Sequence, residues 1–211
     1  MRLTKRQEAV LIGTVLGDAY LQKTGEKNAR LRLEHSEKQQ RYLLWKAGIF
    51  PRLFQGKPSS IERMHPKTKR IYRYVRYQSS ASPVLGSWRK RFYESGQKKI
   101  PSNLDTLLTE ALSLAVWYMD DGYYYAKDRN SYLYLGCVSK EEAQTAARAI
   151  QNNFAVRSRV YNKKKKGFAL YFGVADTKKL HKLVRKHLLP EFDYKLLPEL
   201  RKRPIATSLT P

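Results

Sequence analysis

The chain has 211 residues, of which 42% are hydrophobic, enough to bury a core in one compact domain or two small ones, and this excludes a disordered chain. Its 42 Lys and Arg residues against 18 Asp and Glu give a formal net charge of +24, so we expect a polyanionic partner; nucleic acid is the usual one, although charge alone does not separate it from a ribosomal or membrane-surface role. The single cysteine, Cys137, excludes an intrachain disulfide framework or a paired-cysteine zinc site and fits a reducing intracellular compartment.

A helix is predicted at the start of the chain, ending at Asp18. Thr4 is followed three positions later by Gln7, which is the spacing of a capping box. The small residues Gly13 and Gly17 lie on one tight, weakly polar face of this helix. The sequence therefore predicts a helix that can approach another element closely near the end that carries a carboxylate.

The rest of the first half gives hairpin and helix signals in alternation. In chain order we predict a hairpin, a second helix capped by Ser36, a long loop rich in proline and glycine, a Tyr-rich strand, and a third helix with proline in its first turn: 19–24 with 29–35, 37–48, then 70–79, and finally the helix from Ser82 onward.

The second half repeats this plan. A helix over 109–120 ends at Asp121, and we predict a hairpin, a helix with a capping box at Ser139, two strands around a lysine-rich turn, and a last helix capped by Asp176: 122–127 with 131–138, 139–153, 156–162 with 168–174, and 176–187.

The register of the two halves indicates an internal repeat. Asp18 stands 18 positions before Ser36, and Asp121 stands 18 positions before Ser139. Farther along, Lys98 and Lys195 each precede a proline by three positions. Markers recurring in the same order favour a two-fold repeat in which the pattern αββαββα occurs twice.

Two segments at equivalent places in this repeat carry a resemblance to a known family. Leu11-Ile-Gly-Thr-Val-Leu-Gly-Asp18-Ala and Leu114-Ala-Val-Trp-Tyr-Met-Asp-Asp121-Gly resemble the paired motifs of single-chain, intron-encoded LAGLIDADG homing endonucleases. The similarity covers roughly residues 8–198. It implies an α/β (α+β) fold of two pseudo-two-fold αββαββα halves, whose antiparallel sheets form a saddle that binds DNA.

The same resemblance implies a function. We expect a monomeric, metal-dependent endonuclease that hydrolyses double-stranded DNA at a long asymmetric target. The expected organisation is an N-terminal half, a linker, a C-terminal half and a basic flexible tail: 1–97, 98–108, 109–198 and 199–211.

Asp18 and Asp121 are the expected metal ligands and catalytic carboxylates. If the two motif helices pack side by side, their carboxylates project from one seam, and two such charges repel unless a divalent cation lies between them. Mg²⁺ is the expected ion, with Mn²⁺ as a substitute and Ca²⁺ binding without supporting cleavage; backbone carbonyls of Gly17 and Asp120 are candidate further ligands. The alternative is that both acids are ordinary helix ends, although a carboxylate there opposes the helix dipole.

Lys98 and Lys195 form a second expected pair. In relatives, basic residues near these positions lie close to the metal, which implies that here they stabilise the phosphate or polarise water. Phosphate-contacting or solvated lysines are the alternative reading, and Lys99 can replace Lys98 because the register is uncertain by one position.

A set of side chains on the expected outer faces of the sheets is predicted to contact DNA. Arginine suits guanine and glutamate suits cytosine in the major groove, whereas a solvated strand face and a solvated basic loop are the alternatives. On the strand over 70–79, Ile71 and Val75 point to the core and leave Arg73 unexplained on the apolar side, and the orientation of 131–138 stays open because hydrophobicity and repeat register disagree at Leu133 and Leu135. The predicted DNA contacts are Gln22, Arg30, Arg32, Glu34, Arg70, Tyr72, Tyr74, Arg76, Gln78, Tyr125, Lys163, Lys164 and Lys165.

Several other classes are excluded or disfavoured. The sequence has no apolar run long enough to span a membrane, no apolar signal-peptide region, no phosphate-binding loop for NTP hydrolysis and no histidine spacing of the metalloprotease type. We expect an intracellular location with DNA, with organelle and cytoplasm both open. The rival function is a non-cleaving nucleic-acid binder on the same scaffold, an intron maturase or a regulator; the presence of both aspartates favours the enzyme.

Overall fold

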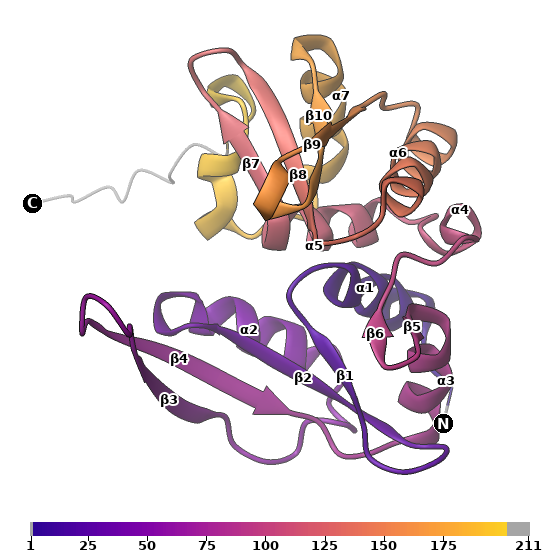
Figure 1. Ribbon diagram of the computed structural model, residues 1–211, viewed down its shortest axis with the longest axis vertical. Helices are drawn as coiled ribbons and strands as arrows, with labels where there is room; N and C mark the ends of the chain where they lie inside the picture. The colour runs from indigo at the N-terminus through magenta and orange to yellow at the C-terminus, as the bar shows by residue number, and fades with distance from the viewer. Residues whose placement is uncertain (1, 202–211) are drawn as a thin grey trace, which may run out of the picture.

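The computed structural model of the protein describes residues 2–201, and it confirms the order αββαββα in both halves (Figure 1). The first half comprises α1 (Lys5–Leu16), β1 (Tyr20–Lys23), β2 (Ala29–Ser36), α2 (Gln40–Gly48), β3 (Ser59–Met64), β4 (Ile71–Gln78) and α3 (Pro83–Phe92). The second comprises α5 (Ala111–Asp121), β7 (Gly122–Tyr125), β8 (Asn130–Gly136), α6 (Lys140–Phe154), β9 (Arg159–Asn162), β10 (Phe168–Phe172) and α7 (Val174–Val184).

Short elements connect and follow the halves. The segment between them holds a small hairpin and one turn of helix: β5 (Tyr93–Glu94), β6 (Gln97–Lys98) and α4 (Leu104–Leu107). The remaining 3-10 turns are η1 (Glu37–Gln39), η2 (Lys164–Lys166), η3 (Pro190–Lys195) and η4 (Pro198–Leu200). The expected basic tail thus begins within an ordered turn, and residues 202–211 lie outside the described part of the chain.

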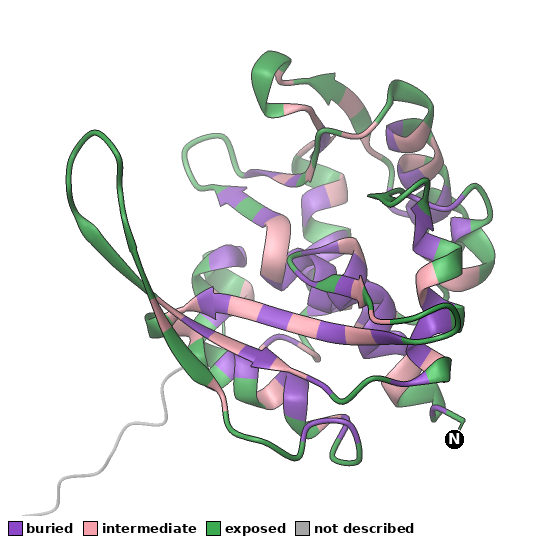
Figure 2. Ribbon diagram, turned by 60° about the horizontal axis from the view of Figure 1, so that its bottom comes forward, coloured by how far each residue is buried: buried purple, intermediate pink, exposed green. Residues whose placement is uncertain are grey.

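Each half contains one four-stranded antiparallel sheet, with strand orders β1-β2-β4-β3 and β7-β8-β10-β9. Along β2, every second side chain is buried and the others are partly exposed, which Figure 2 shows as alternating colours. This period of two directs Leu31 and Leu33 into the core and Arg30, Arg32 and Glu34 outward. The mixed, antiparallel fold expected from the sequence is confirmed.

Helices α1 and α5 pack side by side where the two halves meet (Figure 1). A methyl group added to Gly13 would lie within 3.0 Å of the Ser113 carbonyl oxygen, and one added to Gly17 would lie within 3.0 Å of the Asp120 carboxylate. The expected role of small residues at this seam is therefore confirmed, because nothing larger than glycine fits either position without movement.

We predict that Gly13→Ala destabilises the protein by about 1–3 kcal/mol, because the added carbon overpacks the seam against a backbone oxygen that cannot rotate away. Gly48→Ala, at the last residue of α2 with no atom within 4 Å of the added carbon, is the matched control and should be neutral or slightly stabilising. Chemical denaturation of both variants measures the difference. Equal stability of the two variants would show that the seam relaxes freely.

The β3–β4 hairpin differs from the sequence-based expectation. The first of its strands, β3, falls in the segment interpreted as a loop, and Ile71, expected in the core, is 61% exposed. The distal part of this hairpin extends beyond the body, so both of its faces meet solvent (Figure 2). Arg73 needs no buried partner there, because it forms an exposed ion pair with Glu62 at 2.9 Å.

Two predicted helix caps are wrong. Ser36 makes no side-chain capping bond, because β2 continues through it and a 3-10 turn precedes α2. Asp176 lies inside the first turn of α7, whose cap is Gly173, and its carboxylate accepts the backbone N–H of Arg157 at 3.1 Å. The capping boxes at Thr4 and Ser139 are confirmed.

The side chains of β8 point as the hydrophobic pattern indicates and not as the repeat register does. Leu133 is fully buried, whereas Tyr132 and Tyr134 lie on the outer face. The turn between β7 and β8 is one residue shorter than the turn between β1 and β2, since Tyr125 pairs with Asn130 but Lys23 pairs with Ala29. A difference of one residue in the turn exchanges the two faces of the strand that follows it. The spacing from each aspartate to its serine is nevertheless equal, because β8 ends earlier than β2.

None of the helices in the described part of the chain is long and apolar enough to span a bilayer.

Candidate active site at the paired helix ends

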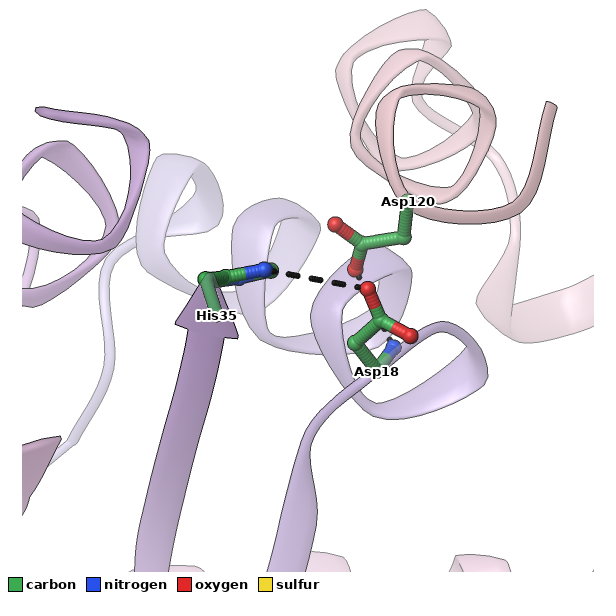
Figure 3. Close-up of side chains that lie close together, drawn as sticks. All are labelled: Asp18, His35 and Asp120. Carbon is green, nitrogen blue, oxygen red and sulfur yellow. Dashed lines mark hydrogen bonds and ion pairs between the residues drawn. The ribbon is translucent and has the colours of Figure 1, made fainter. Parts of the chain in front are cut away.

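The C-terminal ends of α1 and α5 bring two acidic residues together between the sheets. Asp18 follows the cap residue Gly17 at the end of α1, and Asp121 is the last residue of α5. The backbone N–H of Asp18 donates to the Asp120 carboxylate at 3.2 Å, which joins the two ends (Figure 3). The Asp18 side chain is 48% exposed.

The acids at these ends repel one another. Burial, followed by the charges of Asp18 and Asp120, raises the pKa of Asp121 from 3.8 to about 8. Burial and the charge of Asp120 also raise the pKa of Asp18. Such crowding stabilises neither carboxylate in its charged form, and it is the arrangement that a bound cation would relieve.

Lys98, in the segment between the halves, contacts the end of α1, and Lys195, in η3, contacts the end of α5. Lys98 donates to the Gly17 carbonyl at 2.6 Å, and Lys195 donates to the carbonyls of Met119 at 2.6 Å and Asp120 at 3.3 Å. Each ammonium thus lies at the negative end of a helix dipole. Burial lowers the pKa of both lysines, that of Lys195 to about 8, while the aspartates oppose the change.

A buried ion pair that sequence reasoning missed supports this site. Lys46 on α2 donates to both carboxylate oxygens of Asp120, at 2.7 and 2.8 Å, and neither side chain is exposed. The ammonium also lies 3.2 Å from Nε2 of His35 and 4.2 Å above the ring of Tyr42. The signal in the sequence was a lysine three and four positions after Leu43 and Tyr42, on the apolar face of its helix.

His35 is the third member of the acidic cluster drawn in Figure 3. Burial and the Lys46 charge lower its pKa to about 4, so the ring is neutral and Nε2 accepts from Lys46. Its Nδ1 lies 3.8 Å from the Asp18 carboxylate. The ring therefore packs between the ion pair and the exposed acid.

A different network holds Lys195 in place. The Tyr118 hydroxyl donates to the Lys195 carbonyl at 2.9 Å and lies 2.9 Å from Nε2 of His181. The other ring nitrogen of His181 accepts the Leu197 backbone N–H at 2.9 Å, which places the ring proton on Nε2. This histidine is buried, with a pKa lowered to about 4, and so it is a neutral structural group.

Two sets of ligand atoms at these helix ends could hold a divalent cation, and one set suits it better than the other. Ligand atoms of Asp18, His35 and Asp120 lie within 4.8 Å of one another. Both Asp120 oxygens already accept from Lys46, however, so an ion using Asp120 would lie against a buried ammonium that repels it. Asp18 and Asp121 offer hard carboxylate oxygens with raised pKa values and no such tight partner. The Gly17 and Asp120 carbonyls lie beside them, bound to the lysines.

The side chains predicted to contact DNA in the first half lie on the outer face of its sheet. Glu34 accepts from three arginines, Arg32 on its own strand at 3.1 Å, Arg76 on the adjacent β4 at 2.8 Å and Arg63 on β3 at 2.5 Å. Arg30 donates to Gln78 at 3.2 Å. Arg70 and Tyr72 lie farther out on the exposed hairpin, whereas Gln22 and Tyr74 lie on the sheet itself. Glu34 thus fixes a cluster of guanidinium groups, which the sequence pattern did not indicate.

The remaining predicted contacts lie in the second half. Tyr125 is on the outer face of β7, and Lys164 and Lys165 are exposed in the turn η2. Lys163 packs over the Tyr132 ring, with its ammonium 4.1 Å from the ring centre.

Known proteins share the sequence pattern and the fold of this chain. A family model described as the LAGLIDADG DNA endonuclease family matches residues 8–180. The chain belongs to this family. The LAGLIDADG protein is 29% identical over 203 residues to "Probable intron-encoded endonuclease 1" of Wickerhamomyces canadensis, covering 92% of this chain and 85% of that protein.

Solved structures and other relatives agree. The structure "The homing endonuclease I-WcaI bound to its DNA recognition sequence" matches with a TM-score of 0.85 and 27% identity, over 93% of this chain and 88% of that chain. "Cytochrome b mRNA maturase bI2" of Saccharomyces cerevisiae is 26% identical over 89% of this chain, which spans 46% of that relative. The chain likewise spans about half the length of several other curated relatives. The expected family resemblance is confirmed.

The crowded acids predict a pH dependence of stability in the metal-free LAGLIDADG protein. Since the pKa of Asp121 rises from 3.8 to about 8 on folding, its contribution is fully favourable below pH 3.8 and is lost as the pH rises through about 8. We therefore expect Asp121→Asn to melt progressively above wild type as the pH is raised from 4 to 8 in EDTA, by ~2–4 °C for each kcal/mol. A melting-temperature difference that does not change with pH would show that Asp121 is not strained.

Proposed function

We propose that this protein is a monomeric homing endonuclease that cuts double-stranded DNA at a long, asymmetric target with a divalent metal bound by Asp18 and Asp121. The observation that carries the proposal is the meeting of these two acids, with raised pKa values, at the ends of the paired helices between two sheets. Because one chain supplies two non-identical halves, the two half-sites of the target should differ in sequence.

Mg²⁺ is the proposed ion, with Mn²⁺ able to replace it and Ca²⁺ binding without cleavage. When bound, such an ion supplies a polarised water and neutralises charge on the scissile phosphate. Asp18 and Asp121 hold the ion, and the Gly17 and Asp120 carbonyls are candidate further oxygen ligands. Lys98 and Lys195 lie beside the acids, where their ammonium groups can stabilise the charge that develops on phosphate.

The sheets supply the DNA-binding surface in this proposal. Their outer faces carry the arginine cluster around Glu34 in one half and a group of tyrosines in the other, and the formal net charge of +24 attracts the phosphate backbone. The proposed place of action is wherever the cell holds the target DNA, in an organelle or in the cytoplasm.

A non-cleaving role, such as that of an intron maturase, is the second candidate. The 26% identity to the yeast mRNA maturase favours it. The first candidate is preferred because the site retains both carboxylates and both lysines, which RNA binding alone does not require.

Selection of cleaved sequences from a randomised duplex library tests the proposal. With Mg²⁺ we expect one long asymmetric sequence to be enriched among the cut molecules, and we expect none in EDTA or with Ca²⁺ alone. Enrichment of bound but never cleaved duplexes would favour the non-cleaving role.

The two lysines give a separate prediction. Lys98→Met and Lys195→Met should each lower the single-turnover cleavage rate by roughly 10²–10³-fold, the size typical of removing one stabilising donor from a transition state. Affinity for the target should change much less, because neither ammonium lies on the outer sheet faces. Lys99→Met is the matched control, since Lys99 pairs with Glu94 on the surface. A wild-type rate for both variants would remove the lysines from the chemistry.

A further inference from the structure

The outer faces of the two sheets differ in chemistry. On the first sheet, arginine, glutamate and glutamine side chains hydrogen-bond one another, with Tyr20, Tyr72 and Tyr74 on the same face. On the second, each of the four strands carries tyrosine on its outer face, and Arg159 on β9 lies on the same face opposite Tyr171. We call this set of tyrosines the tyrosine face, and it comprises Tyr123, Tyr125, Tyr132, Tyr134, Tyr161 and Tyr171.

Strand register places these rings in a continuous layer. Tyr132 pairs with Tyr123 on one side and with Tyr171 on the other. The ring centres of Tyr132 and Tyr171 are 5.3 Å apart, as are those of Tyr161 and Tyr171. The layer therefore crosses the sheet from β7 to β9 without an acidic side chain in it.

Four of these tyrosines, Tyr123, Tyr125, Tyr134 and Tyr161, are between 36% and 48% exposed, and most of the ring pairs are tilted. Tyr132 and Tyr134 stack with an angle of 20° between their planes, and the ammonium of Lys163 lies 4.1 Å from the Tyr132 ring centre. Stacking on a tyrosine ring requires an unpaired base, whereas a DNA duplex presents only the edges of its bases in the major groove. What the layer presents outward is ring carbon together with hydroxyl groups; the hydroxyls can donate to base edges or accept from them, and the ring carbon makes up most of each side chain.

A major groove offers one apolar feature to such a surface, the 5-methyl group of thymine. We propose that the tyrosine face reads its half-site through thymine methyl groups, whereas the arginine-rich first sheet reads hydrogen-bonding base edges. The inference rests on the DNA-binding part of the proposed function and not on cleavage. It makes the half-site under the second sheet rich in A·T pairs, and it makes the face determine specificity.

The test uses the full-length protein and duplexes selected for binding in EDTA, so it does not depend on the nuclease. A photo-crosslinker on Cys137, the single cysteine, which is exposed directly after β8, identifies the half-site that faces the second sheet. Thymines are then replaced by uracil, which lacks only the methyl group, in one half-site at a time. Dissociation constants are measured by gel shift.

We expect uracil in the crosslinked half-site to weaken binding by about 3–4-fold for each contacted methyl group, and by less than about twofold in total in the other half-site. In the Tyr132→Ala variant, replacing thymine by uracil should raise the dissociation constant by a smaller factor than in wild type. In Tyr132→Phe the factor should be unchanged, because the ring and not the hydroxyl makes the contact. A melting curve for each variant confirms that it is folded.

Four results would overturn the inference. They are the absence of any enriched duplex, a crosslinked half-site without thymine, an equal effect of uracil in both half-sites, and stronger binding to single-stranded competitor than to duplex. If the uracil effect is found but no duplex is cut with Mg²⁺, the proposed catalysis fails while the reading of thymine stands.

Discussion

Asp121→Asn should abolish cleavage, lowering the single-turnover rate with Mg²⁺ by more than about 10³-fold, while target affinity in Ca²⁺ or EDTA changes by less than about tenfold. The amide keeps the size of the side chain but removes one of the two carboxylates that would hold the ion in the proposed site. It also removes the charge whose burial, followed by repulsion from Asp18 and Asp120, raises the pKa of Asp121 to about 8, so the metal-free variant should be at least as stable as wild type.

Asp105→Asn is the matched control, because Asp105 is exposed on α4 and contacts neither the site nor the sheet faces. Cleavage of a labelled duplex carrying the selected target measures the rate. An Asp121→Asn protein that cuts at the wild-type rate would place the metal site elsewhere, and the Asp18, His35 and Asp120 cluster would then be the next candidate.

Lys46→Met should have the largest effect on stability, about 3–5 kcal/mol, because it leaves the fully buried Asp120 carboxylate without its ammonium partner. In a domain of this size such a loss lowers the melting temperature by roughly 10 °C. Asp120→Asn should also destabilise, since it leaves Lys46 buried without a carboxylate.

The double variant Lys46→Met with Asp120→Asn separates the pair from its parts. It should be more stable than the sum of the two single effects predicts, and a double-mutant cycle in chemical denaturation measures the coupling. Lys182→Met, on the exposed side of α7, is the control for loss of a lysine. Strictly additive effects would show that the two charges do not stabilise each other.

Much of this fold could be predicted because its signals are local. The capping boxes at Thr4 and Ser139, the turn residues of the hairpins and the repeat register all fix elements within a few positions. The strand β3 escaped prediction because its outer end has no core contact and hence no alternating pattern. The faces of β8 escaped it because repeat counting assumed equal turns in the two halves.

The candidate site also contains residues that could be predicted from the sequence and residues that could not. Asp18 and Asp121 could be found because they end two matching helices, and Lys98 and Lys195 because each precedes a proline at a fixed distance. The Lys46 and Asp120 pair joins residues 74 positions apart in sequence and in different halves. No local sequence pattern indicates a contact between residues so far apart, so only the contacts of α2 with α5 in the structure reveal it.

The same pair limits how this chain can be divided. Gly17 faces Asp120 across the seam, so two copies of the first half docked symmetrically would set glycine opposite glycine and would offer Lys46 no carboxylate. Each copy would then bury an unneutralised ammonium, which costs several kcal/mol. The N-terminal half therefore depends on the C-terminal half for the carboxylate that pairs with Lys46, and an engineered homodimer built from it would first have to replace Lys46.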